Sequence, residues 1–134
     1  MSEHLIRLRG GWERLEPGER SPATRVTLPL LGFPEGPGRV RLSRWFQAPR
    51  LEPGRETLWL RLDAVAGLIA VVLNDSEIAH GPFPTSPVLV RLSENLSTRN
   101  RIVLEVESPQ QRDPAPADFR WGEVALVVRG VDPA

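Results

Sequence analysis

The stretch from Leu58 to Gly81, LWLRLDAVAGLIAVVLNDSEIAHG, decides the fold. In residues 58–63, leucine occupies every second position, and a strand with one buried face has this period of two. Residues 68–73, LIAVVL, are apolar at every position, which is typical of a strand covered on both sides. Asn74-Asp75 suits a two-residue hairpin turn, and a shorter return strand follows over Ser76 to Ala79. The stretch therefore predicts three consecutive strands, the last two forming a hairpin.

Short alternating segments separated by turns continue through the rest of the chain. Pro29 interrupts one of them, and because proline lacks the donor of a central strand, we expect this piece at an edge or outside the sheet. No stretch longer than a turn has a helical period. The sequence thus predicts an all-β fold, a two-sheet antiparallel β-sandwich of the jelly-roll type. The further strand candidates are His4 to Arg9, Val26 to Leu30, Arg39 to Gln47, Val88 to Leu92, Ile102 to Val106 and Val124 to Val128.

Length and composition limit the class of protein. The 134 residues predict one domain over 1–134, with its core in 5–129 and a loose tail at 130–134. The 17 basic residues are balanced by 17 acidic ones, which argues against a nucleic-acid or membrane-surface partner. Without cysteine there is no disulfide, thiolate metal site or cysteine nucleophile.

The amino-terminal segment is charged and has none of the features of a signal peptide. No segment approaches the roughly twenty apolar residues that a membrane span requires. We therefore expect a cytoplasmic protein without a membrane partner.

Residues that could support catalysis are few and scattered. Asp63, Asp75 and Glu77 lie at strand ends or beside a turn, where solvated carboxylates are common. His4 and His80 are far apart and have no companion at metal-ligand spacing. Nucleophile-elbow, phosphate-loop and dinucleotide motifs are missing. The sequence predicts no catalytic residue, no metal site, no cofactor and no enzymatic activity.

Several segments together carry a family resemblance. They are RVRLSRWFQAP (39–49), LWLRLDAV (58–65), AVVLND (70–75), SEIAHG (76–81), VLVRLSENL (88–96) and NRIVLEVESP (100–109). In this order they resemble the sugar-binding domain at the amino end of family 2 glycoside hydrolases, the β-galactosidase and β-glucuronidase group. The strand with Arg44, Phe46 and Pro49 is similar to an Arg-x-Phe strand followed by proline, and Arg99-Asn100 is similar to a Gly-Asn pair before a Val-rich strand.

The resemblance implies a galactose-binding-like jelly roll with a carbohydrate ligand. The sequence departs from the family pattern in three places, because Ala64 and Asp75 stand where the family has glycine and the segment HGPF (80–83) is shorter than the usual loop. The catalytic carboxylates of the family sit in a barrel domain that this sequence does not contain. We therefore carry over the fold and not the hydrolysis, and expect a non-catalytic carbohydrate-binding module.

A sugar site needs an aromatic platform and planar polar side chains. His80 and Phe83 are the leading candidates because they fall in the proline-rich loop HGPFPTSP (80–87), and rigid exposed loops commonly hold ligands. The other aromatic candidates are Trp45, Trp59 and Trp121, and the other polar ones are Arg44, Arg61, Asn74 and Arg120.

Each of three candidates has a simpler interpretation that remains open. Trp121, like Trp12, lies beside a loop and is of the kind that closes the end of a sandwich core. Asn74 is explained by hairpin geometry alone. Arg44 shares the inward parity of Phe46, so it is either a buried, paired arginine or the sign of a nearby bulge.

An alternative function follows from side chains that face outward. With the leucines of 58–62 in the core, apolar residues fall on the opposite faces of the strands, where an antiparallel sheet in water is usually polar. This much apolar surface predicts an interface, most simply a homo-oligomer. The chain is then an interaction or assembly domain that keeps the fold without binding sugar. The outward residues are Trp59, Leu89, Val103, Ala125, Val127 and one side of 68–73.

Overall fold

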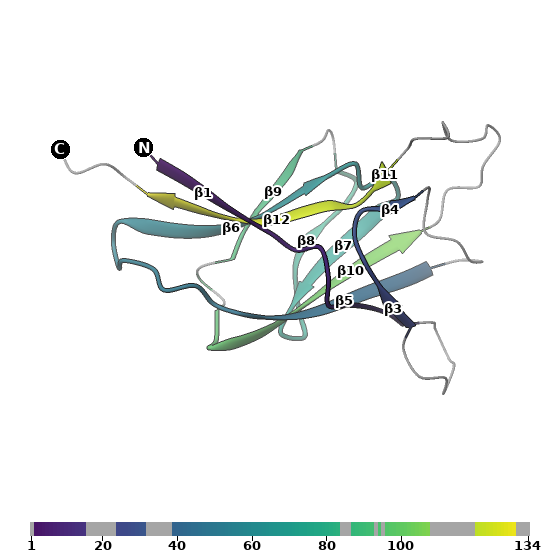
Figure 1. The fold of residues 1–134 in the computed structure, drawn as a ribbon, viewed down its shortest axis with the longest axis horizontal. Coiled ribbons are helices and arrows are strands. Elements are labelled where there is room, and N and C mark those ends of the chain that lie inside the picture. The colour runs from purple at the N-terminus through teal and green to yellow at the C-terminus, as the bar shows by residue number, and fades with distance from the viewer. Residues whose placement is uncertain are drawn as a thin grey trace.

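The computed structural model describes residues 2–15, 24–31, 39–83, 87–92, 94, 96–107 and 120–130. These residues form strands in three sheets, every strand pair is antiparallel, and none of this described part is helical. Two of the sheets form the layers of a sandwich (Figure 1). The prediction of an all-β antiparallel sandwich is confirmed. Of the predicted tail, Gly130 ends the last strand, and 131–134 lie outside the described residues.

The four-stranded sheet, hereafter the small sheet, brings the two ends of the described chain side by side (Figure 1). Its order is β1 (Ser2–Arg7), β12 (Glu123–Gly130), β6 (Glu56–Asp63) and β9 (Val88–Arg91).

The six-stranded sheet, hereafter the large sheet, forms the second layer. Its order is β3 (Thr24–Val26), β2 (Trp12–Leu15), β5 (Arg39–Gln47), β10 (Arg99–Glu107), β7 (Leu68–Leu73) and β8 (Ser76–His80). A short third pair joins β11 (Arg120–Trp121) to β4 (Leu30–Leu31).

The core lies between the small and large sheets and follows the alternation of the sequence. The three leucines of β6 are fully buried, as are Leu42 of β5 and Leu104 of β10. Burying one such side chain contributes about 1.5–3 kcal/mol to folding, so these alternate positions select the face each strand turns inward. Two buried tryptophans extend the same cluster toward the ends of the sandwich.

The stretch 58–81 divides between the two layers. β6 pairs in the small sheet with β12 and β9, whereas β7 and β8 form a hairpin in the large sheet. Residues 64–67 carry the chain across, with Ala64 at φ 53° and Gly67 at φ 84°. Both faces of β7 are covered, since Ala70 and Val71 point to opposite faces and are both fully buried. The three strands are confirmed, but β6 and β7 do not pair.

Two strand predictions in the amino-terminal third of the chain need correction. Trp12–Leu15 is a strand that was not predicted from the sequence. Four residues are too few to show alternation, and this segment is a strand because it pairs with β5. The predicted strand over 26–30 is broken at residues 27–29, between β3 and β4. Pro29 therefore lies outside the sheets, as its missing donor predicted.

The predicted outward apolar side chains do lie on outer faces, but their exposure differs. On the small sheet, Leu89 is 38% exposed while Val127 is only 1% exposed, and Leu5, which was not among the predicted residues, is 43% exposed on the same face. On the large sheet, Val103 is buried beside Ser43. Of the large apolar side chains that are exposed, Leu5 and Leu89 lie on the small sheet, Trp45 lies on the large sheet and Leu31 lies in the third pair.

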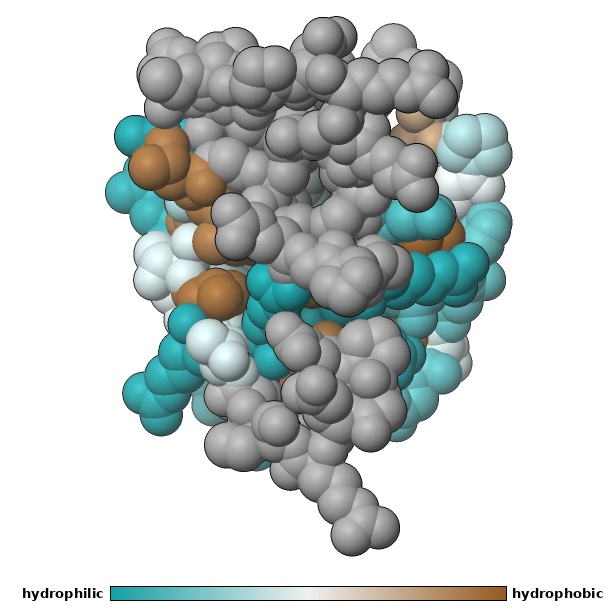
Figure 2. All heavy atoms as spheres, turned by 90° about the vertical axis from the view of Figure 1, so that its right-hand side faces the viewer, coloured by the Kyte–Doolittle hydropathy of each residue, from teal (hydrophilic) through white to brown (hydrophobic). Residues whose placement is uncertain are grey.

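Figure 2 shows the end of the sandwich that faces right in Figure 1. The described residues visible there form separate hydrophobic areas among hydrophilic side chains (Figure 2). A search of the described residues finds no helix long and apolar enough to cross a membrane.

Candidate functional site

The strongest candidate site is a pocket of about 230 Å³ on the outer face of the small sheet. We call it the small-sheet pocket. β1 contributes Arg7, β6 contributes Arg61 and Asp63, and β12 contributes Glu123, while apolar lining comes from Leu5, Val124 and Ala125.

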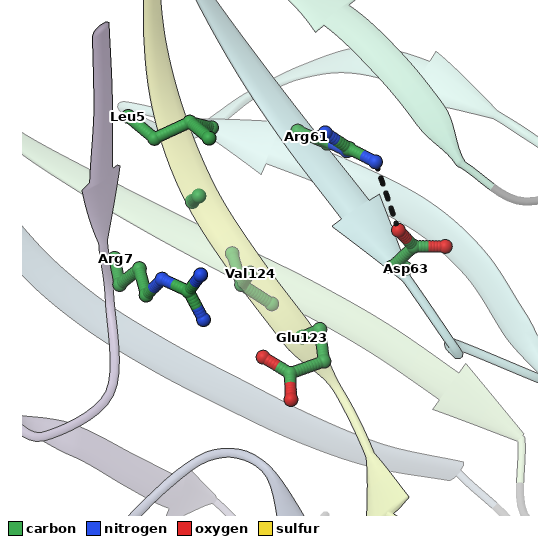
Figure 3. Close-up of a pocket in the computed structure, with 7 residues that line it drawn as sticks. Leu5, Arg7, Arg61, Asp63, Glu123 and Val124 are labelled. Atoms are coloured by element: carbon green, nitrogen blue, oxygen red, sulfur yellow. Dashed lines mark hydrogen bonds and ion pairs between the residues drawn. The ribbon is translucent and has the colours of Figure 1, made fainter.

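The charged side chains of this pocket lie as two sets, each with one guanidinium and one carboxylate. Arg61 donates to Asp63 over 3.3 Å, with both side chains partly exposed. On the other side of β12, the guanidinium of Arg7 and the carboxylate of Glu123 point toward one another (Figure 3). The pocket thus presents both hydrogen-bond donors and acceptors, and its formal charges cancel.

Strand register places two carboxylates directly opposite one another. Glu123 is the register partner of Asp63 across the β12 and β6 pair. Like charges at such positions destabilise a strand pair by roughly 0.2–1 kcal/mol. Arg61 is paired with Asp63, and Arg7 points toward Glu123 (Figure 3), so each carboxylate has a cation near it that weakens this repulsion.

Trp59 lies on the same face, one register row away from the polar side chains. Its indole N–H donates to the hydroxyl of Thr57 over 2.9 Å, and the guanidinium of Arg129 lies 5.2 Å from the ring centroid. Val127 is its register partner on β12. Of the predicted site residues, only Arg61 lines this pocket, and Trp59 lies next to it on the same face of β6.

Arg44 and Trp45 lie on the large sheet, away from the small-sheet pocket. Arg44 is half-buried, and its guanidinium donates to the carbonyls of Gly10 (2.6 Å) and Trp45 (3.1 Å). Burial lowers the pKa of Arg44 below its ordinary value. The register of β5 with β10 is continuous through Arg44, so the pairing shows no bulge there, and Arg44 is a half-buried arginine bonded to backbone carbonyls rather than a fully buried one. Trp45 is 49% exposed on the outer face of the sheet.

Asn74 occupies the hairpin turn and is tied to β10. Its side-chain oxygen accepts from the backbone N–H of Arg101 (2.9 Å), and its amide donates to Asn100 (2.9 Å). Its φ of 50° is the left-handed conformation expected of the turn. These contacts agree with the simpler interpretation of Asn74 as a turn residue.

His80 and Phe83 do not project together from an exposed loop. His80 is the last residue of β8, and its Nδ1 lies 2.8 Å from the carboxylate of Glu77. Phe83 follows the strand, is half-buried, and packs against the core. The pairing of β8 with β7 extends one residue further than the alternation indicated, which moves His80 into the sheet.

Trp121 is fully buried in the core, so no face of its ring is exposed. Its indole N–H donates to the carbonyl of Ala66 over 2.9 Å. Trp12 is equally buried and donates to Leu8 over 2.8 Å. The interpretation of both tryptophans as core residues that close the sandwich is confirmed. The neighbouring Arg120 is exposed.

Three of the four charged residues of the small-sheet pocket were not predicted as site residues. Arg7 and Glu123 face outward on their strands, but one lies near each end of the chain, and only the register of β1, β12 and β6 brings them together. Asp63 was interpreted as a solvated strand end. Alternation along each strand shows that these charged residues face outward, but it does not show which strands are neighbours in the sheet. Within the described ranges, no three His, Cys, Asp or Glu side chains are grouped to hold a metal ion.

Comparison with solved structures gives the fold a counterpart in known enzymes. The FMN-binding β-glucuronidase from Facaelibacterium prausnitzii L2-6 is similar over 94% of this chain, with TM-score 0.70 and 20% identity. A putative β-galactosidase from Bacteroides fragilis matches over 96%, with TM-score 0.69 and 13% identity. A rhamnosidase from Novosphingobium sp. PP1Y matches over 96%, with TM-score 0.70 and 17% identity.

Searches against family models and curated proteins return no match. This chain spans only 22%, 23% and 15% of the three glycosidase chains, respectively. At these identities the likeness concerns the fold. The chain therefore has the sandwich fold of one domain-sized part of β-glucuronidase and β-galactosidase chains, as its sequence resemblance predicted.

Proposed function

We propose that this chain is a non-catalytic carbohydrate-binding module and that the small-sheet pocket holds the sugar. The observation that carries the proposal is the convergence of two guanidiniums and two carboxylates, from Arg7, Arg61, Asp63 and Glu123, on one pocket. Sugar hydroxyls both donate and accept hydrogen bonds. Carboxylates accept from them, and guanidiniums donate to them.

The cancelling charges of the pocket favour a neutral sugar. An anionic ligand would be repelled by Asp63 and Glu123, and a cationic one by Arg7 and Arg61. The exposed side chain of Leu5 and the methyl of Ala125 supply apolar surface for the C–H groups of a pyranose ring. A pocket of about 230 Å³ suits one or two sugar units at the end of a longer glycan.

The likeness to glycosidases supports the ligand class and not the reaction. The similar enzymes are named for glucuronides, galactosides and rhamnosides, all of them sugars. This chain corresponds to less than a third of each enzyme, and fold alone does not carry a reaction. Binding without hydrolysis is therefore the function we propose.

The test is a glycan array followed by titration of the best neutral ligand. Glu123→Gln and Arg61→Gln should each weaken binding by about tenfold, since each removes one charge-assisted hydrogen bond. Glu77→Gln, on the edge of the large sheet, is the matched control and should leave the affinity unchanged. No neutral glycan binding, or equal losses in all three variants, would refute the proposal.

A second candidate function is an assembly domain that uses the same face. Leu5 and Leu89 are both substantially exposed on the outer face of the small sheet, on either side of Trp59 and Val127. An isologous dimer through this face would cover the apolar surface and the pocket together. This candidate therefore excludes sugar binding by the dimer.

Solution mass measured across protein concentration tests the second candidate. A dimer that becomes monomeric in Leu89→Glu supports it, and because Leu89 is exposed this variant should fold normally. Dissociation of the same dimer by a neutral sugar would show that both functions use one face. A monomer at all concentrations removes the assembly function.

A further inference from the structure

A second cluster on the opposite side of the sandwich has a different chemistry. It lies on the outer face of the large sheet, around Trp45, which is the most exposed of the four tryptophans. Arg101 is the register partner of Trp45, and Arg99 lies two residues earlier on the same face of β10. We call these three residues the Trp45 cluster.

Both guanidiniums of the cluster are already held in place. The guanidinium of Arg99 lies 4.3 Å from the centroid of the Trp45 ring, and that of Arg101 lies 5.9 Å from it. Stacking on an indole uses the flat face of a guanidinium and leaves its N–H edges available. Arg101 is further fixed because its Nε donates to the hydroxyl of Ser43 over 2.7 Å, and Ser43 is buried.

The charge balance differs between the two ends of the β5 and β10 pair. At one end, Glu105 is opposite Arg41 and forms an ion pair with it over 3.1 Å, and Glu107 is opposite Arg39. At the other end, Arg99 and Arg101 face Gln47 and Trp45, which are uncharged. Among the described residues, neither arginine of the cluster has a carboxylate partner.

Two fixed guanidiniums beside an exposed indole fit a ligand with a negative group next to a flat apolar surface. We infer that the Trp45 cluster is a second saccharide site, selective for sugars that carry a carboxylate or a sulfate. The C–H face of the pyranose would pack on the part of the Trp45 ring that the guanidiniums leave exposed, and the anionic group would accept from the edges of Arg99 and Arg101. Preorganised guanidiniums lose little rotamer entropy on binding, which strengthens such a contact.

A saccharide fits the observations better than a nucleic acid. The chain carries no net charge, and the other end of the face is neutral because Glu105 and Glu107 lie opposite Arg41 and Arg39. A long polyanion would gain no net attraction beyond the cluster, whereas one or two sugar units need only the cluster itself. The saccharide class rests on the proposed function, but the residues are different, so the two sites can fail separately.

Titration calorimetry with two matched pairs of ligands tests the inference. Trigalacturonic acid is compared with its methyl ester, and 6′-sulfated lactose with lactose, at about 50 mM salt where screening is weak. The charged member of at least one pair should bind about tenfold more tightly than its neutral match. The pair that shows this preference identifies the anionic group as a carboxylate or a sulfate.

Variants then assign the binding to these residues. Arg99→Gln and Arg101→Gln should each lose about tenfold in affinity for the charged ligand, and Trp45→Ala should lose a similar factor. Arg41→Gln removes a guanidinium that is paired on the same face, so it is the matched control and should change the affinity less than about twofold. In an NMR titration, the indole N–H of Trp45 should shift while that of Trp59 stays.

Four outcomes would overturn the inference. They are equal affinity for charged and neutral ligands, an Arg41→Gln loss as large as that of Arg99→Gln, inorganic sulfate binding as tightly as the sulfated sugar, and a short oligothymidylate binding more tightly than any saccharide. Loss of lactose binding in Glu123→Gln alone concerns the small-sheet pocket and leaves the Trp45 cluster unaffected.

Discussion

Asn74 and Asn100 are joined by a 2.9 Å hydrogen bond between their side chains, and Asn100 is fully buried. The side-chain oxygen of Asn100 also accepts from the backbone N–H of Ser97, and its amide donates to the Ser97 carbonyl, both over 2.8 Å. A single amide therefore ties the β7–β8 hairpin to the entry of β10. A buried polar side chain that is fully satisfied in this way fixes one arrangement of the strands.

Removing this amide should destabilise the sandwich. Asn100→Ala leaves two backbone groups of Ser97 and the amide of Asn74 without their partner, and the cost of unfilled buried hydrogen bonds predicts a loss of about 3 kcal/mol. Urea denaturation followed by tryptophan fluorescence measures it. Gln47→Ala, an exposed residue of the same sheet, should stay within about 0.5 kcal/mol. Equal midpoints for the two variants would contradict this role.

Gly67 should tolerate no side chain. It has φ 84°, and a Cβ built on it would collide with the backbone carbonyl oxygen of Glu107, whose N–H donates to the Gly67 carbonyl over 2.9 Å. Gly67→Ala should cost about 3 kcal/mol or more, because left-handed strain and a backbone clash add. Gly54 has a similar φ of 77° but open space around it, so Gly54→Ala should cost only about 1 kcal/mol. Thermal unfolding of both variants separates the clash from the strain.

Asp75 stands where the family pattern has glycine. Its backbone conformation explains why glycine would suit this position. Asn74 and Asp75 have φ 50° and 68°, the combination of a hairpin turn in which both central residues are left-handed. Asp75→Gly should raise stability by about 0.5–1 kcal/mol, and Asp75→Ala should lower it by a similar amount. Melting temperatures that move in the same direction for both variants would contradict the turn geometry.

The local sequence was enough to predict the strands that have clear alternation and a turn at each end. Arg39–Gln47 and Leu68–Leu73 have the bounds that the sequence predicted. The first strand has one buried face and alternates, the second is buried on both faces and is apolar throughout, and in each the pattern stops where the strand ends. Short strands such as Trp12–Leu15 were missed, since their conformation comes from pairing with β5 rather than from their own four residues.

The sites were less predictable than the fold because they depend on register. Trp59 and Arg61 share a strand, so their common face was visible in the sequence. Glu123 becomes the neighbour of Asp63 only through the pairing of two strands that are far apart along the chain. Parity likewise placed Trp45 outward, but its contact with Arg99 and Arg101 needed the register of β5 and β10.

The four tryptophans have different environments, and this gives a final prediction about stability. Trp121→Phe removes the hydrogen bond to the carbonyl of Ala66 and leaves space in a fully buried position, which should cost about 2–3 kcal/mol. Trp45→Phe keeps an aromatic ring at a half-exposed position and should cost less than about 1 kcal/mol.

The comparison is informative because both variants make the same chemical change in the same fold. Urea midpoints with unchanged m-values would show that the native state alone is affected. If the two losses are equal, Trp121 does not close the end of the core in solution, and its ring becomes available as the sugar platform that the sequence first suggested. If only Trp121→Phe is destabilised, the exposed aromatic surface for ligands consists of Trp45 and Trp59, one on each face of the sandwich.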